Sequence, residues 1–374
     1  MADAEDPSKK YDQAFFLTLA AKGKEAWNAW RRDPANKDVR VTFASIDFSE
    51  APRDEIDFSG FEFGDEANFA GCRWRGLEWE EIPKDPKAFK PGRACFTGAA
   101  FGEGASFGGA AFDDWGTFDR AAFGERTGFD GAVFGYGASF NGADFGYGTS
   151  FGSAVFDGRA SFNGATFGDL ATFVCAAFGI RASFTGADFG DNATFTGAAF
   201  GPAAIFADTR FKGCVEFSGT SSEGWSRSLG LTAEETNEKV KEGGIALKKR
   251  HEDSWKRWGS GPDRFLTISF AHARFHGEAN FSGRTFEGPP ILSRRAFTTR
   301  RILVLRPSMP GPISLAPTLV LLAPTASIGL PKPKSRFNSA VFGNSPKIGR
   351  TTISNATFIS RNARPNAAST SINF

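Results

Sequence analysis

The sequence predicts an all-β solenoid: a quadrilateral β-helix with short capping and inserted α-helices. Three observations predict this fold class, namely an unusual composition, a strict phenylalanine repeat and a glycine content that disfavours helices. The chain has 374 residues, with 42 Phe and 44 Gly but only 3 Tyr and 2 Met. A core made mostly of one aromatic residue indicates repetition, because ordinary cores mix several aliphatic residues.

Phenylalanine recurs between residues 96 and 217 with gaps that alternate between five and six residues without exception. The residue two positions before each Phe is Ala in 18 of these 23 units, and it is small or β-branched in the others. The predicted structural ladder consists of Phe96, Phe101, Phe107, Phe112, Phe118, Phe123, Phe129, Phe134, Phe140, Phe145, Phe151, Phe156, Phe162, Phe167, Phe173, Phe178, Phe184, Phe189, Phe195, Phe200, Phe206, Phe211 and Phe217.

An eleven-residue period also occurs in right-handed helical coils, so the period alone does not decide the structure. Residues 94–219 contain 25 Gly, and each glycine costs a helix about 1 kcal/mol relative to Ala. Extended segments joined by glycine corners avoid this cost, because glycine accepts positive φ. In such a segment residues i and i−2 face the same side, so each Phe and its small partner point inward. Four units then close a coil, with Phe stacked on Phe about 4.8 Å above.

Units such as Ala138-Ser139-Phe140-Asn141-Gly142 resemble the pentapeptide-repeat family, whose pattern is small–polar–Leu/Phe–polar–Gly. The resemblance covers residues 96–217 densely, and 43–74 and 270–286 more loosely. It implies a right-handed quadrilateral β-helix. The alternating sixth residue departs from the pattern, is similar to a Phe-rich bacterial branch of the family, and predicts wider corners on two of the four sides. The motif is specific for the fold and not for a function.

Two stretches outside the repeat are predicted to be helical. Residues 13–33 form an amphipathic pattern with Leu19, Trp27 and Trp30 on one face. The same spacing recurs in Leu247, Trp255 and Trp258. Because the end of a solenoid exposes unpaired strand edges, both helices are interpreted as caps, each beginning a separate stretch of β-helix. The predicted segments are a capping helix (1–36), first coils (37–75), an inserted loop (76–93), the main β-helix (94–219), a helical insertion or second cap (220–262), further coils (263–288), a Pro-rich basic segment (289–335) and degenerate repeats or a disordered tail (336–374).

The C-terminal region differs in composition from the rest. Residues 288–374 contain 12 Lys and Arg and no acidic residue, and residues 289–335 contain nine Pro and no phased Phe unit. Three interpretations stay open: a disordered basic arm, degenerate coils, or translation of a shifted reading frame across 289–335. Translating the alternative frames of the gene distinguishes the third from the others.

No catalytic constellation is recognised, and no cofactor or metal is expected. His272 and His276 lie four residues apart on a predicted strand and turn, so they are interpreted as surface residues and not as metal ligands. Asp144 and Asp188 each precede a Phe and are expected to point outward. The four cysteines show no metal-binding spacing and are expected to be thiols in a reducing cytoplasm; they are Cys72, Cys95, Cys175 and Cys214.

The sequence therefore favours a non-catalytic scaffold for protein interaction. The expected anchor is Trp115 or the pair Tyr136 and Tyr147, which are placed at equivalent corners one period apart. The partner is an unidentified protein, no small-molecule substrate is expected, and a homodimer is compatible with the pattern.

Two alternatives are retained. Residues 94–219 hold 13 acidic and 6 basic residues, and some relatives in the resembling family imitate duplex DNA and engage type II topoisomerases, although nucleic-acid binding itself is not expected. The second alternative is a membrane-associated repeat protein, although no stretch reaches the roughly 18 apolar residues of a membrane span. The charged N-terminus has no apolar signal core, which favours a cytoplasmic location.

Overall fold

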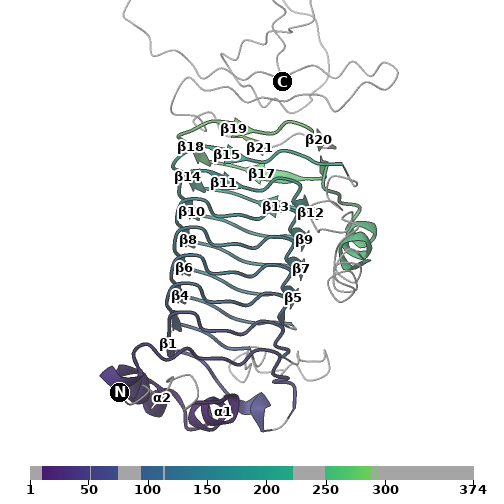
Figure 1. Ribbon diagram of the computed structural model, residues 1–374. Coiled ribbons are helices and arrows are strands. Elements are labelled where there is room, and N and C mark those ends of the chain that lie inside the picture. The colour runs from purple at the N-terminus through teal and green to yellow at the C-terminus, as the bar shows by residue number, and fades with distance from the viewer. Residues whose placement is uncertain are drawn as a thin grey trace, which may run out of the picture.

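The computed structural model describes residues 11–50, 52–74, 94–112, 114–221 and 249–287, together with the backbone of a strand at 291–292. These residues form a parallel β-solenoid of about seven turns, which rises as a straight tower (Figure 1). The predicted all-β solenoid is therefore confirmed. The predicted inserted loop at 76–93 and the predicted segments at 289–335 and 336–374 lie outside the described residues, apart from the strand at 291–292.

Each coil passes through four walls, which we number from the Phe96 position onward. Wall 2 is an eight-stranded sheet; its strands are β1 (Glu62–Gly64), β2 (Ala100–Phe101), β4 (Ala122–Phe123), β6 (Asp144–Phe145), β8 (Thr166–Phe167), β10 (Asp188–Phe189), β14 (Arg210–Phe211) and β18 (Arg274–Phe275). Wall 4 is a seven-stranded sheet; its strands are β3 (Ala111–Phe112), β5 (Val133–Tyr136), β7 (Val155–Gly158), β9 (Ala177–Ile180), β12 (Ala199–Phe200), β16 (Arg264–Phe265) and β20 (Thr285–Phe286).

Walls 1 and 3 carry single bridges low in the tower and short strands higher up. The strands of wall 1 are β13 (Ala204–Ile205), β17 (Ile268–Phe270) and β21 (Ile291–Leu292). The strands of wall 3 are β11 (Ala193–Thr194), β15 (Val215–Glu216) and β19 (Ala279–Asn280). All strand pairs in the four walls are parallel, and Phe aligns with Phe across most of them, as in the pairing of Phe123 with Phe101 and with Phe145. One complete coil of the main repeat therefore leads from Phe101 to Phe123, which is four Phe units along the chain.

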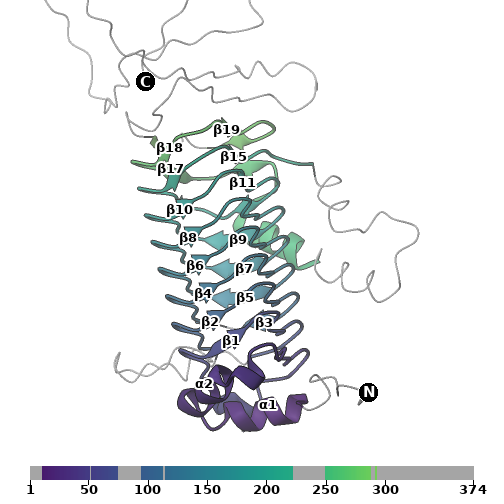
Figure 2. The same cartoon turned by 60° about the vertical axis from the view of Figure 1, so that its left-hand side comes forward.

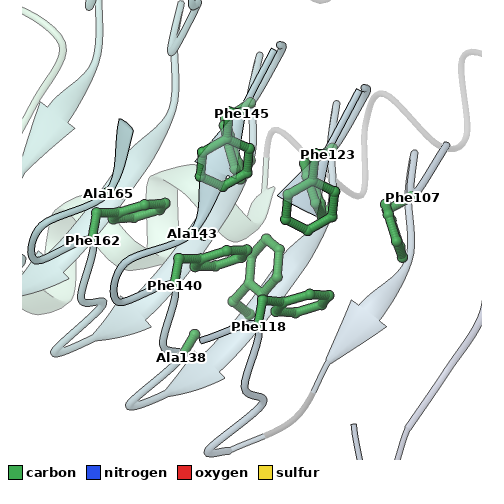
Figure 3. Close-up of a cluster of buried hydrophobic side chains, with 14 of the residues drawn as sticks. Phe107, Phe118, Phe123, Ala138, Phe140, Ala143, Phe145, Phe162 and Ala165 are labelled. Carbon is green, nitrogen blue, oxygen red and sulfur yellow. The ribbon is translucent and has the colours of Figure 1, made fainter. Parts of the chain in front are cut away.

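The core consists of aromatic rings stacked along each wall. All 23 predicted ladder residues are at most 4% exposed. Phe140 shows the common geometry, with ring centroids 4.7 Å from Phe118 below and 4.8 Å from Phe162 above, all nearly parallel (Figure 3). Rings from opposite walls meet edge to face, as Phe140 of wall 1 meets Phe151 of wall 3 at 5.7 Å and 90°. Each such aromatic pair contributes about 0.5–1.5 kcal/mol beyond the area it buries.

The wider corners follow walls 2 and 4, where six residues separate successive Phe. Glycine follows Phe directly at most of these places because adjacent coils approach closely. A Cβ atom on Gly124 would lie 2.4 Å from the backbone carbonyl carbon of Gly102 one coil below. The third residue after Phe has positive φ at most of these wide corners, and several of these residues are not glycine, such as Arg126 (56°) and Leu170 (59°).

The N-terminal end is covered by two helices and not by the single helix predicted over 13–33. Gly23 has a φ of 87° and separates α1 (Gln13–Ala20) from α2 (Lys24–Arg32). The indole of Trp27 is fully buried, packs 5.4 Å from the Phe63 ring, and donates from Nε1 to the carbonyl of Glu62 at 2.8 Å.

Trp30 of α2 lies beside Trp27, with ring centroids 5.8 Å apart. Two short 3₁₀ helices follow: η2 (Pro34–Asn36) comes directly after α2, and η3 (Arg53–Glu55) lies between Phe48 and Phe58.

The tower is one continuous solenoid, so the interpretation of a second cap that begins a separate stretch is wrong. Phe211 pairs directly with Phe275, although nearly three coil lengths of sequence separate them, and their rings stack at 4.9 Å. The strand edges above residue 217 are thus occupied by strands after residue 263, and no solenoid end exists there for a helix to cover. The helix at 249–258, which carries Trp255 and Trp258, lies against the side of the tower instead (Figures 1 and 2).

A buried arginine replaces a backbone hydrogen-bond donor where the chain leaves the tower. In the regular corner of wall 3, the N–H of Ala198 donates to the carbonyl of Phe195. One coil above, the N–H of Thr220 donates to the carbonyl of Pro262 instead, so the carbonyl of Phe217 lacks the donor that this corner usually provides. The Nε of Arg284 donates to that carbonyl at 2.7 Å, and its Nη2 donates to the carbonyl of Phe195 at 3.1 Å.

Candidate interaction surface

The most distinctive outer feature is an aromatic cluster at the wide corner between walls 4 and 1. We call Trp115, Tyr136 and Arg159, which lie in three successive coils, the corner cluster. The ring centroids of Trp115 and Tyr136 are 5.5 Å apart in an edge-to-face arrangement. The guanidinium carbon of Arg159 lies 5.5 Å from the centroid of the Tyr136 ring. Contacts of this kind between a cation and a ring contribute about 0.5–1 kcal/mol at exposed sites.

Glycine residues in the next coil make room for both rings. A Cβ atom on Gly137 would lie 2.5 Å from the indole of Trp115, and one on Gly158 would lie 3.2 Å from the ring of Tyr136. Each ring therefore lies flat over the backbone of the following coil and not away from the tower. The backbone N–H of Tyr136 donates to the carboxylate of Asp114 at 2.7 Å, which also fixes this corner.

The corner cluster continues upward into a basic edge. Arg159 and Arg181 occupy the same position in consecutive coils, have φ values of 50° and 57°, and are exposed. Ile180, the residue directly before Arg181, lies at the same corner and is half-buried. Partly exposed Trp and Tyr beside Arg is the residue combination that dominates binding energy at protein interfaces.

The second wide corner, between walls 2 and 3, is acidic. Its most exposed apolar side chains are Tyr147, at 46%, and Leu170, at 42%. The acidic residues in the equivalent position of other coils are Glu103, Glu125, Asp169 and Asp191. Arg126 forms an ion pair with Glu103, and with Asp65, Glu66, Asn68 and Ser106 these residues line a shallow hollow at the lower end of this corner.

Tyr136 and Tyr147 occupy the same position at the two wide corners, one eleven-residue period apart, so they do not lie at one corner. The eleven-residue period covers only two walls, because Phe134 pairs with Phe156 and Phe123 pairs with Phe145, four Phe units apart in each case. Tyr136 therefore lies at the corner after wall 4, and Tyr147 lies at the diagonally opposite corner after wall 2.

Wall 1 presents a polar ladder to solvent. The carboxylate of Asp119 accepts from the backbone N–H of Asn141 at 2.8 Å, and the side-chain oxygen of Asn141 accepts from the N–H of Asn163 at 3.1 Å. The hydroxyl of Ser161 donates to the same oxygen of Asn141 at 2.5 Å. These bonds join successive coils along the outside of this wall.

Wall 4 carries apolar residues on its outer side, and part of it is covered. Val155, Ala177 and Ala199 point outward from β7, β9 and β12, yet they are only 7%, 1% and 1% exposed. The helix at 249–258 lies against this region of the tower. Its His251 contacts the carbonyl of Ser153 at 3.0 Å, and Arg257 forms an ion pair with Asp157 at 3.0 Å. Burial lowers the pKa of His251 to about 4.

The residues considered for chemistry are dispersed over the surface. His272 lies at a corner with a φ of 58°, with its Nδ1 3.6 Å from the carboxylate of Asp208, whereas His276 follows the end of β18. Asp144 and Asp188 both lie on the outside of wall 2, separated by Thr166 of the intervening strand, and Asp188 pairs with Arg210 at 2.9 Å.

The potential metal ligands and the thiols are also dispersed. Within the described ranges, no group of three His, Cys, Asp or Glu comes together. All four cysteines belong to the described part of the chain and none forms a disulfide.

Comparison with models of known families, with curated proteins and with solved structures found no match. No helix in the described part of the chain is both long and apolar enough to cross a bilayer.

Proposed function

We propose that this protein is a non-catalytic scaffold that binds another protein through the corner cluster. The observation that supports this proposal is the cluster itself: Trp115, Tyr136 and Arg159 contact one another at an outer edge. Their backbone belongs to coils whose rings are stacked and fully buried, so the cluster loses little conformational freedom when a partner binds. The same four-walled coil, with Phe and small residues inside, supports the proposed relation to pentapeptide-repeat proteins.

The walls beside the cluster suit a partner with a regular surface. Wall 1 is polar and hydrogen-bonded from coil to coil through Asp119, Asn141 and Asn163. A partner strand or helix that runs along this wall would meet equivalent polar groups at every coil, about 4.8 Å apart. The aromatic cluster would then supply the apolar anchor at one end of the contact.

A capture experiment with matched variants tests this function. The full chain is immobilised and exposed to an extract of the source organism, alongside a cluster variant (Tyr136→Ser with Arg159→Ser) and a control variant (Arg120→Ser). Arg120 is an appropriate control because it is exposed at a different corner with a similar φ of 55°. Proteins retained by the wild type and the control, but lost with the cluster variant, are expected. If the cluster variant loses no protein, the proposal is wrong.

Neither alternative gains a specific observation from the described residues. The row of acidic residues at the acidic corner is interrupted by Tyr147, and Glu103 and Asp188 are paired with arginines. Duplex DNA carries one charge per about 1.7 Å of its axis, so an interrupted row is a poor imitation. A supercoiling assay with purified gyrase tests this alternative, and no effect at micromolar protein would exclude it. Fractionation of cells tests membrane association, and also the predicted cytoplasmic location.

A further inference from the structure

We propose that copies of this chain associate side by side, with the basic corner of one copy against the acidic corner of the next. The basic corner comprises the corner cluster and Arg181, between walls 4 and 1. The acidic corner comprises Glu125, Tyr147, Asp169, Leu170 and Asp191, between walls 2 and 3. This inference rests on the proposed scaffold role and identifies one partner of the corner cluster as a second copy.

The charges of the two corners are complementary and exposed. Arg159 and Arg181 are exposed on one corner, where Asp157 is already paired with Arg257 and Asp114 accepts from the N–H of Tyr136. Asp169 and Asp191 are exposed on the other corner. Neither aspartate forms an ion pair with any residue that the structure describes. Each carboxylate is nevertheless held in place, because Asp169 accepts from the N–H of Asp191 at 2.8 Å and Asp191 accepts from the N–H of Cys214 at 2.8 Å. Both aspartates are therefore ordered before an arginine of another copy approaches.

The vertical spacing of the two corners also matches. In each coil the chain reaches the acidic corner half a coil after the basic corner. Between two parallel copies at the same level, Tyr136 is therefore beside Tyr147 with an offset of half a coil, and Arg159 and Arg181 are beside Asp169 and Asp191 with the same offset. Both corners belong to the same tower and repeat with the same rise, so a match in one coil holds in the next.

The symmetry of this contact determines the form of the assembly. The two corners are different surfaces on diagonally opposite edges, so the contact is heterologous and produces an open row and not a closed dimer. Contact along edges buries less area than the roughly 1,600 Å² of a standard stable interface. We therefore expect weak association that increases with protein concentration and decreases with salt, since the exposed charges are screened.

Sedimentation of the full chain over a range of concentrations, at low and high salt, tests the inference. The weight-average mass of the wild type is expected to rise with concentration at low salt and to fall at high salt. Two charge-reversed variants are compared, one at the basic corner (Arg159→Glu with Arg181→Glu) and one at the acidic corner (Asp169→Arg with Asp191→Arg). Each variant alone is expected to stay monomeric, because its two corners carry charge of the same sign.

An equimolar mixture of the two charge-reversed variants is the decisive sample, because opposite corners again carry opposite charge. The mixture is expected to regain growth with concentration. The control variant Arg120→Glu with Arg274→Glu changes the same net charge at exposed residues elsewhere and is expected to behave as the wild type. Circular dichroism verifies the fold of every variant, and Asp169→Asn with Asp191→Asn replaces the acidic-corner variant if that one does not fold.

Three results would overturn the inference: a wild type that is monomeric throughout, a dimer that grows no further, or folded charge-reversed variants whose mixture stays monomeric. If the acidic-corner variant does not fold, self-association by the basic-corner or asparagine variant equal to that of the wild type is the contradicting result. A chain that is monomeric but still captures another protein through Tyr136 and Arg159 would contradict this inference alone. A wild type that self-associates, but whose cluster variant retains every protein that the wild type captures from the extract, would contradict the broader scaffold role alone.

Discussion

Removing one ring from the middle of the tower is expected to cost most of the stability that a single core residue can contribute. Phe140 is 0% exposed and stacks on Phe118 and Phe162 at 4.7 and 4.8 Å. Replacing it with Ala leaves a cavity between two parallel rings, which the coils cannot close because their spacing is fixed by backbone hydrogen bonds. We expect the free energy of unfolding to fall by about 3–5 kcal/mol.

Urea denaturation followed by circular dichroism measures this loss. Phe140→Leu keeps part of the volume and is expected to lose less than Phe140→Ala. Tyr147→Ala, which removes an exposed aromatic side chain in the same region, is the control and is expected to change stability by no more than about 0.5 kcal/mol. A loss below about 1 kcal/mol for Phe140→Ala would refute the claim that stacked rings hold the coils together, because that value is an average for any mutation.

Three further predictions concern single positions. Gly124→Ala is expected to lower the free energy of unfolding by about 1–3 kcal/mol, because its Cβ would lie 2.4 Å from backbone, whereas Gly108→Ala, with 3.7 Å of room, should be nearly neutral; equal losses in urea denaturation would contradict the close approach. Arg284→Met leaves the carbonyl of Phe217 without its donor and is expected to cost about 1–3 kcal/mol, measured as a lower midpoint in urea; an unchanged midpoint would show that the arginine replaces no lost bond. The pKa of His251 falls from 6.5 in the unfolded chain to about 4 on burial, so the unfolded chain binds a proton more tightly than the folded chain. Stability that is present above pH 6.5 is therefore lost as the pH falls toward 4. By pH 5 the loss is about 2 kcal/mol, and His251→Gln should lack this pH dependence in urea denaturation at pH 7 and 5.

The stacked core could be predicted from the sequence because one residue type marks each inward position. The alternation of five and six residues, with a small residue two places before each Phe, sets the wall directions and their order without any long-range information. The continuity of the tower across residues 218–263 could not be predicted in this way. Whether Phe211 pairs with Phe275 or begins a new stack depends on contacts between residues far apart in the sequence, and both arrangements satisfy the same local pattern.

The candidate surface was predicted only in part, for a related reason. Trp115, Tyr136 and Tyr147 stand out because other large side chains are rare at the corners. The predicted coil of four units places Tyr136 and Tyr147 on opposite edges, but the side-chain contacts that join Trp115 to Tyr136 between coils are not revealed by the Phe pattern. The contribution of Arg159 was missed, although it follows Tyr136 by one predicted coil plus one residue, which is the signal that would have found it. Similarly, Gly23 divides the predicted N-terminal helix because it adopts a φ of 87°.

The way in which extra residues leave the tower has a consequence for how this chain tolerates change in length. Arg73 pairs with Ala111, and Phe211 pairs with Phe275, in both cases across more sequence than one regular coil contains, yet the rings on both sides remain stacked. Added segments therefore emerge at corners while the strands on both sides continue to pair and their rings continue to stack. A foreign peptide or a whole domain grafted at such a corner should be displayed on a rigid column at a known height. Removal of one whole repeat of four Phe units, such as residues 138–159, should shorten that column by one coil without altering its cross-section.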